Sequence, residues 1–145
     1  MNRSYTVRVA NGSCDRTAIR TIRDTVFVNE QSVPPEIEWD GLDDKCIHII
    51  VEDENRDAIG TGRLHPSGKI GRMAVIRQWR SRGIGGAILD KLVDMATQQG
   101  HEAVFLHSQA HAAEFYVSAG FEAEGVEFEE AGIAHCLMRK TLIVG

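Results

Sequence analysis

The sequence has few cysteines and no long hydrophobic segment. Cys14, Cys46 and Cys136 are odd in number, lie far apart and form no CxxC pair, so we expect reduced, buried thiols instead of a disulfide framework. No run is apolar and long enough to cross a bilayer, and the first residues lack the apolar core of a signal peptide. These absences predict a soluble, cytoplasmic protein with no membrane partner.

Acidic residues are missing from one segment of an otherwise acidic chain. The formal net charge is -5 and the pI is about 5.6, which argues against nucleic acid as a partner. Between Ala58 and Leu89 there is no Asp or Glu, and the basic residues of this segment are Arg63, Lys69, Arg72, Arg77, Arg80 and Arg82. A cationic zone inside an acidic protein favours a small anionic ligand.

The chain has no internal repeats or low-complexity linkers, and its 145 residues fit one domain over 1–145. Alternating or continuous apolar runs predict strands, and apolar residues at helical spacing predict helices. The predicted strands are 5–9, 46–53, 58–64, 69–76, 103–107 and two within 121–144; the predicted helices run from Ser13 or Asp15 to about Asn29, over 83–99 and over 110–120; residues 32–44 form a loop. This order predicts an α+β fold, with helices packed on a mixed sheet.

The segment QWRSRGIGGAIL, residues 78–89, places three glycines and two arginines at the start of a predicted helix. The first N–H groups of a helix lack intrahelical partners and attract anions, phosphate above all, where no side chain blocks the approach. The alternative is a glycine-rich start that serves only close helix–sheet packing. Neither a GxxxxGK[ST] loop nor a complete dinucleotide fingerprint is present, so an ATPase or a dehydrogenase is disfavoured.

The motif [QR]xxGx[GA] at residues 80–85, preceded by RMAVI, resembles the pyrophosphate loop of the GNAT superfamily of N-acetyltransferases. AVFLHSQAHAAEFYVSAGF resembles that family's second conserved block, and VFVNEQSVP, HIIV, GTGRL and FEEAGIAHCLM are similar to its ElaA-like and YjcF-like bacterial branch. Ala134 stands where that branch usually has proline, and we expect a change in loop stiffness there. The resemblance implies the acyl-CoA N-acyltransferase fold, a mostly antiparallel sheet with one splayed parallel pair and helices on both faces.

The resemblance also implies acetyl-CoA as co-substrate and indicates where it binds. The backbone of Met73, Ala74 and Val75 would pair with the pantetheine arm. The diphosphate would lie against Arg80, Ser81, Arg82, Gly83, Ile84, Gly85 and Gly86. Gln109, Phe115 and Tyr116 complete the expected cofactor contacts. Arg77 either approaches the ribose phosphate or is only a solvated surface residue.

Acetyl transfer from a thioester to an amine needs a neutral amine, a stabilised oxyanion and a protonated leaving thiolate. By resemblance, Tyr116 is the general acid and the backbone N–H of Val75 stabilises the oxyanion. The alternative for Tyr116 is an aromatic residue on the buried face of its helix. The general base is left open among Glu30, Glu38 and His135. The acidic residues at 36–44 and 127–130 either attract a cationic amine or are simply solvated.

Other functions stay open as alternatives. A non-catalytic acyl-CoA-binding or regulatory domain would keep the glycine loop, and a two-step route would use Cys136 as acyl carrier. His107 and His111 lie four residues apart but lack the glutamate of HExxH, so no metal is expected. The acceptor is left open among a small amine, an amino acid, an aminoglycoside-like compound and a peptide terminus. The resemblance implies that a homodimer is a common state.

Overall fold

A seven-stranded sheet forms the centre of the computed structural model, which describes residues 4–142. Its strand order is β1-β2-β3-β4-β5-β7-β6. The strands are β1 (Tyr5–Val9), β2 (Ile47–Asp53), β3 (Ala58–Leu64), β4 (Lys69–Val75), β5 (Ala103–Gln109), β6 (Glu122–Glu130) and β7 (Ile133–Thr141). β4 and β5 pair in parallel, and the other neighbouring strands pair antiparallel. The mixed sheet predicted from the sequence is confirmed.

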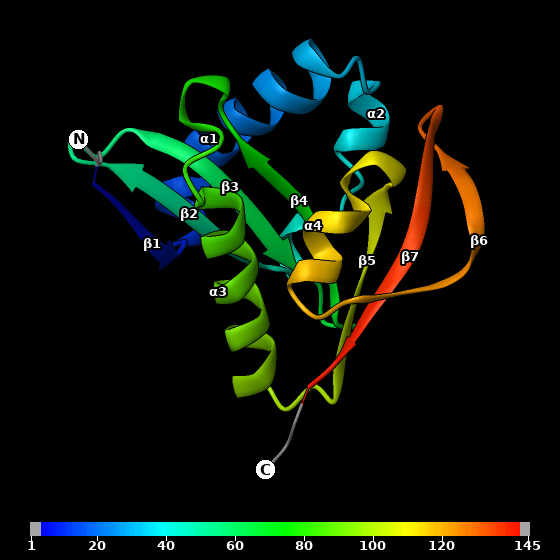
Figure 1. Cartoon of the computed structure of the whole chain (residues 1–145). Helices are drawn as coiled ribbons and strands as arrows, with labels where there is room; N and C mark the ends of the chain where they lie inside the picture. Colours follow the sequence, from blue (N-terminus) through cyan, green and yellow to red (C-terminus); the bar gives the residue numbers. More distant parts are fainter. Residues whose placement is uncertain (1–3, 143–145) are drawn as a thin grey trace.

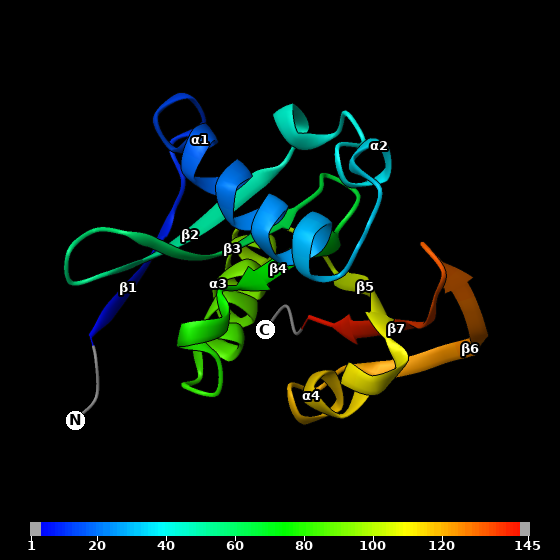
Figure 2. The same cartoon turned by 90° about the horizontal axis from the view of Figure 1, so that it is seen from above.

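Helices cover both faces of the sheet (Figures 1 and 2). They are α1 (Gly12–Arg23), its π-helical continuation η1 (Asp24–Glu30), α2 (Pro35–Glu38), α3 (Ile84–Gln98) and α4 (Ala113–Ser118), with short 3-10 turns η2 (Asp43–Lys45), η3 (Arg77–Trp79) and η4 (Ala110–Ala112). α1 lies on one face of β2–β4, and α3 lies on the other (Figure 2). The apolar stripe of the first helix buries Ile22 and Val26, as its spacing predicts.

Some local predictions are wrong. The N-cap of α1 is Asn11, not Ser13 or Asp15, although the Asp15 carboxylate accepts the Asn11 N–H at 2.7 Å. The predicted loop 32–44 contains α2, because proline fits the first turn of a helix, where its missing N–H costs nothing. Ala134 lies within β7, so it does not stiffen a loop. The predicted end of the last strand near Val144 lies outside the described residues.

The three cysteines are free, as expected, but they are not fully buried. Cys14 is exposed on α1, and Cys46 and Cys136 are half-buried. The prediction of buried thiols is therefore wrong for Cys14 and overstated for the other two. Burial is the largest influence on the Cys46 thiol and raises its pKa, which keeps that group protonated and weakly nucleophilic.

The core between α3 and the sheet depends on close contact at β3. Ile84, Ile88 and Leu92 of α3 are almost completely buried. Gly62 of β3 lies directly beneath them, where a Cβ atom would be 2.7 Å from Ile88 Cγ2 and 2.9 Å from Leu92 Cδ1. The missing side chain thus lets the helix lie on the sheet.

A bulge in β4 separates β4 from β5. These strands share only the partners Lys69↔Phe105 and Ile70↔Leu106. The bulge lies between the pairs Thr61↔Ala74 and Arg63↔Gly71, where β4 has one residue more than the facing part of β3. Arg72, within this bulge, has a left-handed φ of 52°, a conformation that costs free energy for a residue with a side chain. Beyond the bulge the two strands diverge, as Figure 1 shows.

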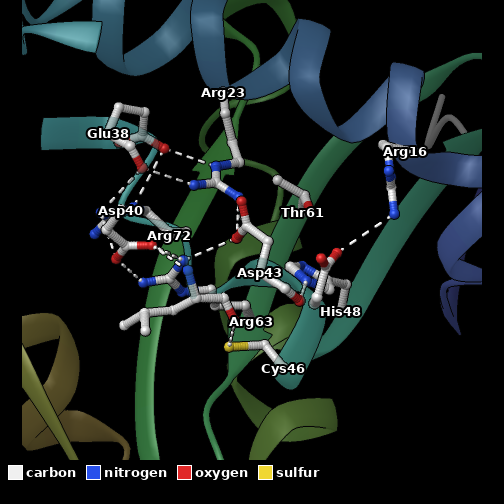
Figure 3. Close-up of polar contacts among 12 residues, drawn as sticks. Arg16, Arg23, Glu38, Asp40, Asp43, Cys46, His48, Thr61, Arg63 and Arg72 are labelled. Atoms are coloured by element: carbon white, nitrogen blue, oxygen red, sulfur yellow. Dashed lines mark hydrogen bonds and ion pairs between the residues drawn. The ribbon is translucent and has the colours of Figure 1, made fainter. Parts of the chain in front are cut away.

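Three arginines and three carboxylates hold the bulge from one side (Figure 3). This buried ion-pair network consists of Arg23, Arg63, Arg72, Glu38, Asp40 and Asp43. Arg23 Nε lies 2.6 Å from Glu38 Oε2, and Arg63 Nη2 lies 2.6 Å from Asp40 Oδ2. Arg72 lies 3.3 Å from the Glu38 carboxylate and 3.1 Å from that of Asp40. The network therefore ties α1, β3 and the β4 bulge to the segment that follows α2.

We predict that Gly62→Ala lowers the free energy of unfolding by about 2 kcal/mol, because the added methyl overpacks a rigid contact. Urea denaturation followed by circular dichroism measures the change. Gly12→Ala is the matched control, since a Cβ there meets nothing within 4 Å. Equal stability of the two variants would show that α3 shifts freely on the sheet.

We predict that Arg23→Met destabilises the fold by about 3 kcal/mol, because it leaves buried carboxylate charge undercompensated. The Arg23 side chain is 1% exposed, and it contacts both Glu38 and Asp43. Arg16→Met is the control, since Arg16 and Asp44 form an exposed pair at 3.4 Å, and such pairs contribute little. A loss no larger than that of the control, measured by denaturant unfolding, would contradict a structural role for the network.

Candidate functional site

Two pockets meet where β4 and β5 diverge. The first, named the glycine-loop pocket, has a volume of about 420 Å³. It is lined by residues 73–75, 79–81 and 83–86 and by Phe115. The second, named the histidine pocket, has a volume of about 410 Å³ and is lined by β4, the end of β5 and the β6–β7 hairpin. Gln31 and Met73 line both pockets. A ligand in one pocket can therefore reach a ligand in the other.

The glycine loop leaves backbone donors open. Gly83 is the N-cap of α3, has a φ of 82° and gives no side-chain cap. The first hydrogen bond inside the helix runs from Ala87 N–H to the Gly83 carbonyl. The N–H groups of residues 84–86 therefore have no intrahelical partner. A Cβ at Gly86 would meet nothing within 4 Å, so close packing does not account for this glycine, and open backbone N–H groups at a helix start are the kind of site that anions occupy.

Arg80 and Glu30 form a bidentate pair beside the glycine loop. The two guanidinium–carboxylate distances are 2.6 and 3.0 Å, and Arg80 Nε also donates to the Val75 carbonyl at 2.9 Å. The hydrogen bond from Arg80 is the largest influence on Glu30 and lowers its carboxyl pKa. A carboxylate held in this way accepts protons poorly, which makes Glu30 unsuited to be the base in this conformation.

The cationic zone of the sequence divides in space. Arg63 and Arg72 lie in the buried ion-pair network and do not line the glycine-loop pocket. Arg82 instead stays near the loop, with its guanidinium 5.1 Å from the centre of the Trp79 ring. Arg63 and Arg72 therefore do not contribute to an anion site at the glycine loop, because carboxylates neutralise their charges.

Aromatic residues close the junction between the pockets. Tyr116 lines the histidine pocket, and its hydroxyl lies 4.0 Å from Met73 Sδ. Burial raises the pKa of Tyr116, so the phenol keeps its proton at neutral pH. Phe115 lines the glycine-loop pocket, with its ring 5.0 Å edge-on from that of Tyr116. Gln109 donates to Gln31 at 3.1 Å and thereby links β5 to the end of η1.

A carboxylate between two histidines lines the histidine pocket. His107 Nδ1 lies 2.9 Å from Glu130 Oε1, and His135 Nε2 lies 3.7 Å from Glu130 Oε2. His135 Nδ1 is 2.7 Å from the Ile133 carbonyl, so this nitrogen carries a proton and Nε2 of the neutral ring has a free lone pair. Burial is the largest single influence on Glu130 and opposes its ionisation, but the hydrogen bond from His107 and the charges of the nearby basic groups together outweigh it and lower the carboxyl pKa.

Sequence reasoning missed this grouping. It considered His107 as a partner of His111 in a metal site, and it placed Glu130 among acidic residues that either attract an amine or are solvated. In the sheet, His135 of β7 pairs with Gln109 of β5 and with Phe128 of β6. His107 and His135 thus lie on one face, two positions apart in register. Strict alternation along 103–109 was the available signal, because it puts His107 opposite the buried positions of that strand.

Glu38 lines the histidine pocket, but its carboxylate is not free. It is 2% exposed and is paired with Arg23 and Arg72. Burial is the largest influence on its carboxyl and raises the pKa despite these arginines. Glu38, Asp40 and Asp43 are paired with arginines, so these acids are neither simply solvated nor free to attract a cationic amine. Glu38 therefore fits a positioning role better than proton transfer.

Within residues 4–142, no group of three or more His, Cys, Asp or Glu side chains has an arrangement that would hold a metal ion. No helix there is long and apolar enough to span a membrane.

Comparison with known sequences identifies the family. The family model for the acetyltransferase (GNAT) domain matches residues 13–142. The uncharacterized N-acetyltransferase YjcF of Bacillus subtilis is 37% identical over 82% of this chain and 87% of its own length. Protein ElaA of Escherichia coli is 31% identical over 87% of both chains. These matches confirm the branch that the sequence motifs indicate.

Comparison with solved structures agrees. The crystal structure of E. coli ElaA has a TM-score of 0.84 and 26% identity, over 94% of this chain and 99% of that one. An acyl-CoA N-acyltransferase from Pseudomonas aeruginosa has a TM-score of 0.82 and 26% identity, over 97% of this chain and 100% of that one. A GNAT family acetyltransferase from Elizabethkingia anophelis, solved with acetyl-CoA bound, shares the fold at a TM-score of 0.72 and 15% identity, over 95% and 98%. The chain therefore belongs to the GNAT acetyltransferase family and has its acyl-CoA N-acyltransferase fold.

Proposed function

We propose that this chain transfers an acetyl group directly from acetyl-CoA to a primary amine. The observation that carries the proposal is the junction at Gln31 and Met73, where the glycine-loop pocket meets the histidine pocket. Two substrates bound in adjoining pockets react without a covalent enzyme intermediate, because proximity supplies much of the required free energy. The family membership supports the reaction class, and the bound acetyl-CoA of the Elizabethkingia protein supports the donor.

Acetyl-CoA fits the glycine-loop pocket. The open N–H groups of residues 84–86 and the guanidinium of Arg82 would receive the diphosphate, and Arg80, which pairs with Glu30, would line the loop beside it. The backbone of Met73–Val75, beyond its last pairing with β5, offers main-chain groups to the pantetheine amides. Ser81 lies in the loop, and Phe115 lies along the pocket wall. Acetyl-CoA supplies the activated thioester, while the chain supplies binding and proton transfer.

His135 is the group best suited to take the amine proton. His135 lines the histidine pocket, and the Glu130 carboxylate, 3.7 Å from its Nε2, compensates the charge of the imidazolium that forms. The neutral amine attacks the thioester carbonyl, whose oxygen is stabilised by the N–H of Val75. The attack forms the C–N bond and a tetrahedral intermediate, and the C–S bond then breaks as the carbonyl re-forms. Tyr116, which burial keeps protonated, donates its proton to the leaving thiolate, and the second proton that the amide nitrogen releases restores the phenol.

The alternative is a domain that binds acyl-CoA without catalysis. The Tyr116–Met73 contact at the pocket junction and the paired histidines favour the enzyme, since ligand binding alone needs neither group. Thiol release from acetyl-CoA, measured over a panel of amines, separates the two functions. Stabilisation of the protein by acetyl-CoA without turnover of any amine would support the binding domain.

We predict that Tyr116→Phe lowers kcat about 100-fold, because the leaving thiolate loses its proton donor. The dissociation constant for acetyl-CoA stays within about twofold, since the ring is retained. Thiol release and isothermal titration measure the two quantities. Tyr5→Phe on β1 is the control, because it removes a phenol remote from both pockets. An unchanged kcat would exclude Tyr116 as the acid.

We predict that His135→Asn lowers kcat/KM for the amine about 100-fold at neutral pH. The asparagine amide still donates to the Ile133 carbonyl, whereas the basic Nε2 is gone. The rate of the variant rises with pH more steeply than that of the wild type, because alkyl ammonium ions deprotonate unaided only near their pKa of about 10.4. His65→Asn, in the β3–β4 turn, is the control. Parallel pH profiles for wild type and His135→Asn would assign the base elsewhere.

A further inference from the structure

Charge in the histidine pocket is balanced except at two places. The guanidinium of Arg72 lies against Glu38 and Asp40, so these three pocket residues neutralise one another together with Arg23, Arg63 and Asp43 behind them. Apart from the two histidines and Tyr116, two ionisable groups of the lining remain outside that network. They are the carboxylate of Glu130 and the ammonium of Lys69.

Lys69 is the cation of the lining that lies outside that network. It begins β4 and faces Phe105 of β5, at the end of the sheet region where the two strands still pair. Its side chain lines the histidine pocket and forms no ion pair with any of residues 4–142. It lies close enough to Glu130 for its charge to favour ionisation of that carboxylate. A lysine in this position offers an anion-binding group to a ligand.

Glu130 and the histidines form the negative site of the same wall. Both histidines lie next to the Glu130 carboxylate, without an arginine to neutralise it. An incoming ammonium group finds a negative charge there, and a proton acceptor in His135 beside it. The pocket thus has one positive and one negative site along its wall.

We infer that the acceptor is an amine that also carries a carboxylate, in the chemical class of amino acids, with its amine at Glu130 and His135 and its carboxylate at Lys69. This inference rests on the proposed function. It narrows the acceptor classes, because a simple amine and an aminoglycoside-like compound each leave one of the two charges unmatched.

The competing acceptors fit the pocket less well. A diamine or polycationic sugar would bring a second ammonium toward Lys69, and like charges repel in a partly desolvated site. A simple alkylamine would cover the Lys69 ammonium with methylene groups and give it no partner. A carboxylate at that end forms a charge-assisted hydrogen bond instead. The wall therefore selects for a zwitterion.

A matched series of acceptors tests the inference. Glycine, β-alanine, 4-aminobutanoate and 5-aminopentanoate are each compared with the n-alkylamine and the diamine of similar length, with acetyl-CoA saturating and thiol release as readout. We expect at least one amino acid to exceed its alkylamine and its diamine about tenfold or more in kcat/KM, the effect of one charged hydrogen bond. An alkylamine or diamine preferred at every length would overturn the inference while leaving the acetyltransferase reaction intact.

Substitution of Lys69 tests whether this residue binds the carboxylate of the acceptor. Lys69→Met removes the preference and leaves KM for acetyl-CoA unchanged, whereas Lys69→Glu shifts the preference to the diamine. Lys91→Met is the control, because Lys91 lies on α3 outside the lining of both pockets, and it keeps the wild-type preference. An amino-acid preference that survives in both Lys69 variants would overturn the assignment.

A binding measurement separates this inference from the proposed function. The thermal midpoint of the CoA-loaded protein is followed as each amino acid is added, for wild type and Lys69→Met. A shift by an amino acid that Lys69→Met abolishes supports the zwitterion site even if no amine turns over, in which case the proposed reaction alone fails. No shift and no turnover would overturn both.

Discussion

The contact of Arg72 with Glu38 and Asp40 determines where the sheet opens. Arg72 sits at the extra residue of β4 in a left-handed conformation that its side chain disfavours. Carboxylates at 3.3 and 3.1 Å, and the carbonyls of Ile37 and Glu38 at 3.2 Å, hold the guanidinium on the α2 side. β4 therefore leaves β5 after Ile70. Both pockets lie along the part of β4 that follows, so their shape depends on this anchored bulge.

The same ion pairs explain how an acidic segment lies inside the protein. Residues 38–43 bring three carboxylates toward the sheet, and three arginines from α1, β3 and β4 meet them there (Figure 3). Buried ion pairs offset their own desolvation cost and contribute little beyond that. What they fix is position, because a guanidinium and a carboxylate meet in only a few geometries. The floor of the histidine pocket is consequently rigid and close to neutral, and Glu130 and Lys69 dominate its field.

Sequence patterns predicted the elements better than their contacts. The strands at 58–64 and 69–76 and the helix at 83–99 follow from apolar spacing with glycine boundaries, and the glycine loop followed from the cost of so many glycines in one turn. α2 was missed because a Pro-Pro pair usually interrupts a helix, whereas Pro35 is the first residue of one here. Pairing of Glu38 with Arg72 joins residues 34 positions apart, and the meeting of His107, Glu130 and His135 depends on strand register. Local pattern carries no information on either, so spacing alone could not decide which acids were free.

The two pockets have almost separate walls, with Gln31 and Met73 lining both. A substitution at any other lining position alters one cavity and leaves the inner surface of its neighbour intact. Along the strand that divides them, contacts to an extended ligand would come from the main chain, which mutation does not change. Related proteins can therefore come to bind a different molecule in one pocket through a few substitutions, while the other pocket and its ligand stay the same.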